Sequence, residues 1–171
     1  EAFTSARDLD QIKTAAAKLK ELGEPVDLPE HFGFLMKWKV IGPFENAGGA
    51  GFDVAYPPER EVSLAAEYEG KKDKVKWVEL STSDDYGVLD LNKLVGPHKG
   101  AIAYAYAEFT SPKTLDAELR LGSVNANKIW LNGELITTNH VYHSGSAVDQ
   151  YVGPGKLKAG RNTILLKIAQ N

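Results

Sequence analysis

The sequence contains no cysteine, and this absence excludes several kinds of chemistry at once. A chain without thiols forms no disulfide, holds no zinc ion or iron–sulfur cluster through thiolates, and has no cysteine nucleophile. Long hydrophobic runs are missing as well, since no stretch approaches the roughly 18 consecutive apolar residues that indicate a membrane-spanning helix. The residues therefore predict neither a thiol-based site nor a membrane span.

A strong excess of charge of one sign is also lacking. The 171 residues include 20 Lys and Arg and 23 Asp and Glu, which gives a formal net charge of −3. We interpret the basic residues as scattered rather than clustered, so nucleic acid is not expected as the main partner. With 43% hydrophobic and 25% charged residues, the composition is that of one globular domain. Because the sequence begins at Glu1 without a leader, we expect a processed protein or an excised part of a longer one.

Motifs of common enzymes are missing too. The glycine-rich stretch 48–51 lacks the Gly-Lys-Ser/Thr ending of a phosphate-binding loop, and no helical pattern follows it. No serine lies in a Gly-x-Ser-x-Gly elbow. We therefore expect no catalytic residues and a protein that is not an enzyme, with a glycosidase or lyase as the catalytic alternative.

The first part of the chain has a helical pattern. Between residues 5 and 22, apolar residues recur at three- and four-residue steps, with charged residues off that stripe. Thr4 or Ser5 is expected to cap this amphipathic helix, and Gly23 to end it. Residues 1–33 are therefore interpreted as a helix followed by a linker.

From residue 34 onward, the apolar period changes to two, which is typical of strands. The alternating sets lie at residues 36–40, 62–68, 75–80, 101–107, 115–121, 129–136 and 164–168. Asn132-Gly133 predicts a type I′ hairpin turn. Eight or nine short strands without βαβ alternation predict an all-β fold over residues 34–171, a jelly-roll β-sandwich preceded by one N-terminal amphipathic helix. The long segment 45–60 is interpreted as a flexible loop of the kind that often carries function.

Three acidic residues, Asp84, Asp85 and Asp90, are the only close group of carboxylates that the sequence suggests. They could form a solvated turn, supply oxygen ligands to a calcium ion, or act in catalysis. Adjacent residues of a strand point to opposite faces, which disfavours the catalytic reading of Asp84 and Asp85. No cofactor is expected, and a structural calcium ion is left open.

Two histidines, His140 and His143, flank Tyr142 in a predicted loop. They are interpreted as exposed loop residues, as sugar contacts or as metal ligands, although a catalytic zinc site would need a third protein ligand. Among the tryptophans, Trp38 is in register with apolar neighbours and is expected in the core. Trp130 has the opposite register to its neighbours and could present its indole face to a ligand.

The second half of the chain resembles a known group of folds. The segments Lys128–Glu134, Asp149-Gln150 and Leu157–Ile168 contain the pattern strand, Leu-Asn-Gly, loop, Leu-x-x-Gly-x-Asn, strand. This pattern is similar to the galactose-binding-domain-like jelly rolls, among them the sugar-binding domain of family 2 glycoside hydrolases. The segment Trp38–Asn46, with Gly51-Phe52-Asp53 and Tyr56-Pro57-Pro58-Glu59, resembles a second signature. That signature is found in uncharacterised domains of planctomycete-type bacterial proteins that follow helical HEAT-like repeats.

The resemblance implies a non-catalytic carbohydrate-binding module of a larger exported protein, periplasmic or secreted, that binds a glycan or glycoconjugate through loops at one end of the sandwich. Other domains of the parent chain are further expected partners. The alternative is a structural or protein-interaction domain without a small-molecule ligand. The residues expected to contact the glycan are Asn46, Asp53, Tyr86, Asn125, Asn127, Tyr142 and His143.

Overall fold

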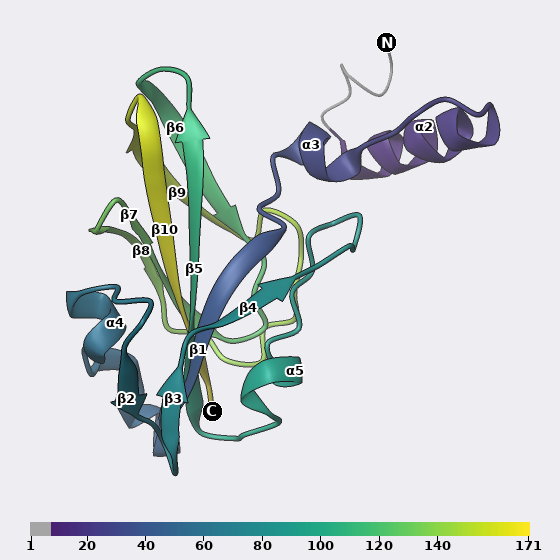
Figure 1. Ribbon diagram of the computed structural model, residues 1–171. Coiled ribbons are helices and arrows are strands. Elements are labelled where there is room, and N and C mark those ends of the chain that lie inside the picture. The colour runs from purple at the N-terminus through teal and green to yellow at the C-terminus, as the bar shows by residue number, and fades with distance from the viewer. Residues whose placement is uncertain (1–7) are drawn as a thin grey trace. The chain divides into compact units, whose positions relative to one another are not determined.

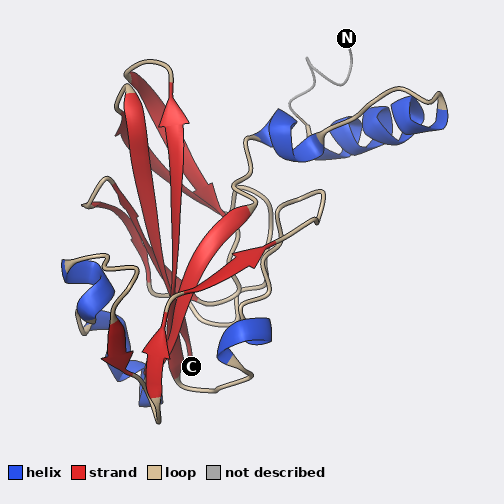
Figure 2. Ribbon diagram, viewed as in Figure 1, coloured by secondary structure: helices blue, strands red, loops and turns tan. Residues whose placement is uncertain are grey.

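The computed structural model describes residues 8–171, which fold mostly into β-strands (Figures 1 and 2). Close contacts divide this part of the chain into two units. The helical unit comprises the described residues as far as Met36 together with Ser81–Leu89, and the sheet unit comprises Lys37–Leu80 and Asp90–Asn171. The segment 81–89 thus groups with the helices rather than with the strands around it. Among the described residues, no helix has both the length and the apolar character to cross a bilayer.

The helical unit begins with the expected amphipathic helix, α2 (Leu9–Glu21). Its cap is Asp8, whose carboxylate accepts a hydrogen bond of 3.0 Å from the backbone N–H of Gln11. The helix thus starts later than predicted, and the expected caps Thr4 and Ser5 lie outside the described residues.

The predicted linker contains a second, short helix, α3 (Leu28–Phe32). Asp27 caps it, proline occupies its first turn, and Gly33 ends it with a φ of 69°. A small apolar core then forms from Ile12, Ala16 and Leu28, which are buried. The partly buried residues Val26, Phe32 and Tyr86 pack against it.

The sheet unit is built on a six-stranded sheet with the order β4-β1-β5-β10-β7-β8. The strands of this sheet are β1 (Lys37–Glu45), β4 (Val78–Ser81), β5 (Ala101–Ser111), β7 (Ala126–Leu131), β8 (Glu134–Asn139) and β10 (Gly160–Gln170). The two longest, β5 and β10, run antiparallel side by side at its centre (Figure 1). Two further pairs are separate: β2 (Glu67–Glu69) with β3 (Lys74–Lys76), and β6 (Leu115–Leu121) with β9 (Tyr151–Leu157). The short helices are η1 (Ala47–Asp53), α4 (Pro57–Arg60) and α5 (Asn92–Val95).

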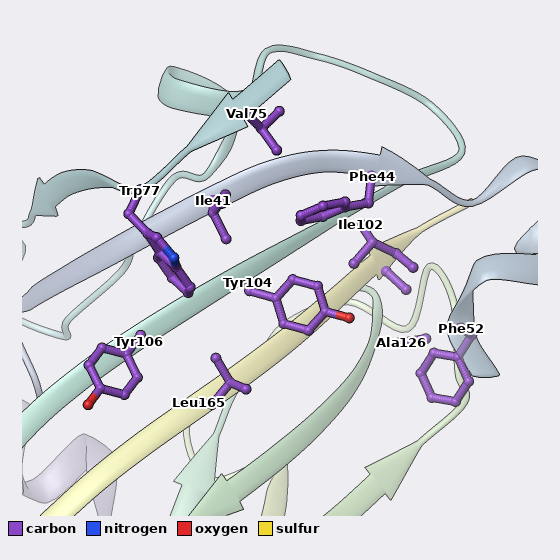
Figure 3. Close-up of a cluster of buried hydrophobic side chains, with 11 residues drawn as sticks. Ile41, Phe44, Phe52, Val75, Trp77, Ile102, Tyr104, Tyr106, Ala126 and Leu165 are labelled. Atoms are coloured by element: carbon purple, nitrogen blue, oxygen red, sulfur yellow. The ribbon is translucent and has the colours of Figure 1, made fainter. Parts of the chain in front are cut away.

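One face of the sheet carries large side chains, as the alternation in β5 predicts. Tyr104 pairs with Ile41 on one side and Lys167 on the other, so these residues share a face. Figure 3 shows the resulting core, in which Phe52 and Trp77 join side chains of the sheet such as Phe44 of β1. The stretch 45–60, expected to be a flexible loop, contains η1 and α4, and buried Phe52 anchors it to this core.

The other face of β5 presents buried alanines. The β6–β9 pair contacts the sheet through small residues, since a Cβ added to Gly155 of β9 would lie 2.8 Å from a methyl group of Leu131 and 2.9 Å from one of Leu119. Only glycine permits this close approach. The unit is thus β-rich and sandwich-like.

Strand boundaries differ from expectation in three places. β1 continues through Gly42-Pro43 to Glu45 with an irregularity in its pairing, whereas the alternating set that predicted it ended at residue 40. Only the last residues of the alternating stretch 62–68 form a strand, and Trp77 separates β3 from β4. The Asn132-Gly133 turn is confirmed, because both residues have positive φ, 52° and 84°.

Candidate functional site

Six of the seven predicted glycan-contacting residues lie at one end of the six-stranded sheet, in or beside its loops. Here β1, β8 and β10 end, and β5 and β7 begin. We call this region the loop end and define it as residues 45–54, 122–128 and 139–150. The predicted residues that it contains are Asn46, Asp53, Asn125, Asn127, Tyr142 and His143. Tyr86 lies in the helical unit, where it packs against the Ile12 core with Lys13 Nζ 5.2 Å from its ring centroid.

Asn46 directly follows β1 and is fully buried. Its amide nitrogen donates to the backbone carbonyl of Gln170 at 2.7 Å and, more weakly, to the Tyr142 hydroxyl at 3.5 Å. Its amide oxygen has no hydrogen-bond partner within residues 8–171. A buried polar atom without a partner costs free energy, so this oxygen is an acceptor whose capacity the described part of the chain leaves unused.

Tyr142 lies between the core and the surface. It is half-buried and packs against the large hydrophobic core, and a Cβ added to Gly49 would lie 3.4 Å from its hydroxyl oxygen. This hydroxyl accepts the weak bond from Asn46, which leaves its proton available for donation. Tyr142 can therefore offer both an apolar ring and a polar group to a ligand.

An aromatic stack adjoins Tyr142. The exposed His140 stacks on the buried Phe52 at 4.2 Å with an interplanar angle of 11°, and it meets the Tyr142 ring edge-on at 5.4 Å. Lys128 Nζ lies 4.5 Å from the Phe52 centroid, a cation–π contact, and 3.3 Å from an oxygen of Asp53. Apolar rings and both signs of charge thus meet at the loop end.

The two other predicted asparagines differ in burial and in their partners. Asn127 is fully buried; its amide nitrogen donates to the Asn125 carbonyl at 3.2 Å, and its oxygen accepts from Asn139 at 3.0 Å. It therefore holds the 122–125 loop in place. The Asn125 amide oxygen is buried and has no partner in the described part of the chain. Thus two predicted site residues, Asn46 and Asn125, each carry an unsatisfied acceptor.

Hydrogen bonds tie the loops of this end together. Gln150 Oε1 accepts from the Ser123 N–H at 2.9 Å, and Gln150 Nε2 donates to Ser144 Oγ at 3.0 Å. The Ser144 N–H donates to the Val124 carbonyl at 3.1 Å. Loops joined in this way can be preorganised for binding, which lowers the entropic cost of ordering them around a ligand.

An ion pair fixes the start of the loop that follows β1. Lys71 Nζ lies 3.0 Å from Glu45 Oε1, and the backbone N–H of Ala47 donates to the same oxygen at 2.7 Å. The hydrogen bond from Lys71, followed by that from Ala47, lowers the pKa of the exposed Glu45 carboxyl below its usual value. Glu45 is therefore ionised at neutral pH and helps to position Asn46.

The three candidate calcium ligands have other partners. Asp84 Oδ1 accepts from the backbone N–H groups of Tyr86 and Val88, as in an Asx turn. Asp85 forms a 2.9 Å ion pair with Lys20, and Asp90 accepts from the Asn92 N–H. No group of three or more His, Asp or Glu side chains in the described part of the chain is placed to hold a metal ion. The calcium hypothesis stays a prediction.

Several residues of this site were not among the seven expected to contact the glycan. One is His140, which was weighed together with His143 as a sugar contact, and another is Phe52. Lys128 and Gln150 were noticed only as parts of a motif. A strand lysine gives no signal that it lies over an aromatic ring from another segment, since this depends on the folded path of residues 46–54.

Comparison of the whole chain with models of protein families, with curated proteins and with solved structures gives no match.

Proposed function

We propose that the sheet unit is a jelly roll of the galactose-binding type and a non-catalytic carbohydrate-binding module that takes a glycan at the loop end. The observation that carries the proposal is the pair of buried, unpartnered amide oxygens of Asn46 and Asn125. Both are acceptors, so a fitting ligand must present donors. Sugar hydroxyl groups are donors, and a polyhydroxylated ligand supplies several of them.

The aromatic groups support the same class of ligand. A sugar ring has an apolar face that packs on an aromatic ring, and the rings of Tyr142 and His140 lie together at the loop end. His143 is exposed beside them and can add a polar contact. With few charges involved, the affinity should be modest. A module of this kind would act outside the cytoplasm as part of a larger exported protein.

Thermal melting against a panel of soluble mono- and oligosaccharides tests the proposal, with each sugar measured in calcium and in chelator. A ligand at about 100 times its Kd stabilises the folded state by about 2.7 kcal/mol, which raises Tm by about 5–10 °C for a chain of this size. A shift of this order with one sugar class is expected. A flat panel in both calcium and chelator would contradict carbohydrate binding.

A pair of tyrosine variants tests the location of the site by calorimetry with the sugar that binds. Tyr142→Phe keeps the ring and removes the hydroxyl, so we expect Kd to rise about three- to tenfold. Tyr68→Phe is the matched control, because Tyr68 also packs half-buried against the same core, from β2. Equal weakening by both variants would place the glycan elsewhere.

The alternative proposal is a structural or protein-interaction domain. It is favoured by exposed apolar side chains at the loop end, where Val124 and Val141 are 44% and 47% exposed. Apolar groups of this kind suit a protein surface at least as well as a sugar. A flat sugar panel combined with a specific protein partner blocked by Val141→Asp would favour this function.

A further inference from the structure

A concave surface lies in the sheet unit, where the β2–β3 hairpin approaches β1. It is a pocket of about 330 Å³. Its lining combines apolar residues with a run of charge: Val40, Gly42, Pro43, Val75, Val78, Lys71, Lys72, Asp73, Lys74, Lys76 and His98. A volume of this size is at the lower end of the range for small-molecule sites, about 300–1,000 Å³.

The alternation of β3 produces the lysine side of this pocket. Val75 is buried in the core, so its neighbours Lys74 and Lys76 point the opposite way and are exposed. Lys72 is exposed in the preceding turn, which is closed by a 3.0 Å bond from the Gly70 N–H to the Asp73 carbonyl. The hairpin thus contributes three exposed lysines to the lining of the pocket.

These lysines differ in how far other groups already balance their charge. Lys71 donates to Glu45, to the Lys99 carbonyl and to the Gly100 carbonyl, so its ammonium group is fully used in holding the hairpin. Lys74 lies 3.5 Å from Glu67 across the hairpin. Lys72 and Lys76 have no carboxylate within ion-pair distance in the described part of the chain. In a protein of net charge −3, two unpaired cations at a pocket attract an anion.

The rest of the lining narrows the class of anion. No arginine and no helix N-terminus line the pocket, so it offers a phosphate neither a bidentate guanidinium nor a set of free backbone N–H groups. No Phe, Tyr or Trp lines it either, whereas single-stranded nucleic acids generally need such rings for stacking. Pro43 and Val78, which are partly exposed, supply apolar surface next to the lysines. A sugar acid matches both parts, since its ring has an apolar face and its carboxylate pairs with an ammonium group.

We propose that this pocket binds an acidic oligosaccharide, with Lys72 and Lys76 pairing with its carboxylate groups. The site is separate from the loop end and does not depend on glycan binding there. The Tyr142→Phe variant should therefore leave it unchanged.

The test is calorimetric titration of the whole chain with hexagalacturonate and with a heparin hexasaccharide, at low and at physiological salt. We expect binding that weakens as salt rises. Lys72→Gln/Lys76→Gln should weaken it about tenfold, because two ion pairs of modest strength are lost. Lys156→Gln/Lys158→Gln is the matched control; it removes the same charge from exposed lysines of β9 and the next turn and should change affinity less than twofold. Lys72→Arg/Lys76→Arg should retain binding.

Control ligands and variants define the results that would contradict the proposal. Maltohexaose, which is neutral, should not bind at the pocket, and inorganic sulfate should not compete at millimolar concentration. A (dT)12 oligonucleotide that binds as tightly as the acidic hexasaccharides would make the site a general polyanion surface. Equal losses in the pocket variant and the control variant, or no binding of either acidic hexasaccharide, would overturn it.

Discussion

Two asparagines near opposite ends of the central strand β10 are both 0% exposed, yet their hydrogen bonding differs. Asn162, near the start of β10, uses all of its amide: its oxygen accepts from Asn132 Nδ2 at 2.9 Å and from the Lys158 N–H at 2.8 Å, and its nitrogen donates to the carbonyls of Lys158 and Gly160. Asn46 contacts the last residue of the same strand, Gln170, and leaves its oxygen unpartnered among the described residues. The Asn162 amide at one end of the sheet is thus fully hydrogen-bonded, whereas the Asn46 amide at the other end leaves an acceptor unused.

The contrast separates polar groups that hold the fold from those suited to a ligand. A buried polar network in which every atom is paired rigidifies the structure. Lys167, also 0% exposed, belongs to this kind: its ammonium group donates to Glu59 at 2.7 Å and to the Val54 carbonyl at 2.8 Å, and the Tyr104 hydroxyl donates to the same carboxylate. Burial is the largest cause of both pKa shifts in this group: it lowers the pKa of Lys167 and raises the pKa of Tyr104. The ion pair between Lys167 and Glu59 holds the 54–59 segment against the sheet.

The largest expected effect comes from breaking this buried pair. Lys167→Met leaves the Glu59 carboxylate buried with only the Tyr104 hydroxyl beside it, so the free energy of unfolding should fall by about 3–5 kcal/mol. Urea unfolding followed by tryptophan fluorescence measures this. The double variant Lys167→Met/Glu59→Gln should be more stable than the single variant, because no unpaired charge remains. A loss of less than about 1 kcal/mol in Lys167→Met would show that the pair does not fasten the segment.

The asparagine comparison itself predicts the next effect. Asn162→Ala removes four hydrogen bonds and leaves its buried partner groups unsatisfied. It should therefore lower the free energy of unfolding by about 2–3 kcal/mol. Asn46→Ala removes one good bond and one weak one, and it also removes an unsatisfied oxygen. Its cost should be about 1 kcal/mol or less. Equal losses in the same urea experiment would contradict the distinction between the two ends.

Local chemistry explains which parts of the fold were predictable. Strict alternation gave β6 correctly at residues 115–121, and Asn132-Gly133 fixed the hairpin between β7 and β8. Strand β9 was missed because Gly153, Pro154 and Gly155 are poor strand formers on their own. They are tolerated there because β9 must approach Leu131 and Ile136 closely, a tertiary requirement that no local pattern shows.

The candidate site was predictable to a similar degree. A jelly-roll expectation groups loops at one end, and six predicted residues do lie there, but Tyr86 lies in the helical unit because the 81–89 segment packs with the helices. Burial was not foreseeable for Asn127, whose neighbours Asn125 and Asn139 satisfy its amide. The interpretation of the basic residues as scattered is wrong for Lys71–Lys76, where four lysines gather at one pocket.

The smallest expected effect concerns Glu108, which pairs with Arg161 and Tyr106 near the Asn162 end of the sheet. Because this ion pair is exposed, it shows how much pairing contributes to stability without burial. Arg161 donates to Glu108 through Nε at 3.0 Å, and the Tyr106 hydroxyl donates to it at 2.7 Å. The hydrogen bond from Arg161, then that from Tyr106, lowers the pKa of Glu108 from 4.5 to about 2. A carboxylate with a depressed pKa contributes its full stability above the ordinary value and loses it as the pH falls through the folded value.

Both side chains of this pair are well exposed, so water and salt should screen the contribution to less than about 1 kcal/mol. The stability difference between the wild-type chain and Glu108→Gln should therefore be present at pH 6 and shrink as the pH falls from about 4.5 toward 2. Urea midpoints at pH 6, 4 and 3 measure it. Glu134→Gln is the control, because Glu134 is exposed and forms no ion pair in the described part of the chain. A difference as large as that of Lys167→Met would mean that pairing, rather than burial, sets how much these polar groups contribute to the free energy of unfolding. The small, pH-dependent difference expected here would mean that burial sets it.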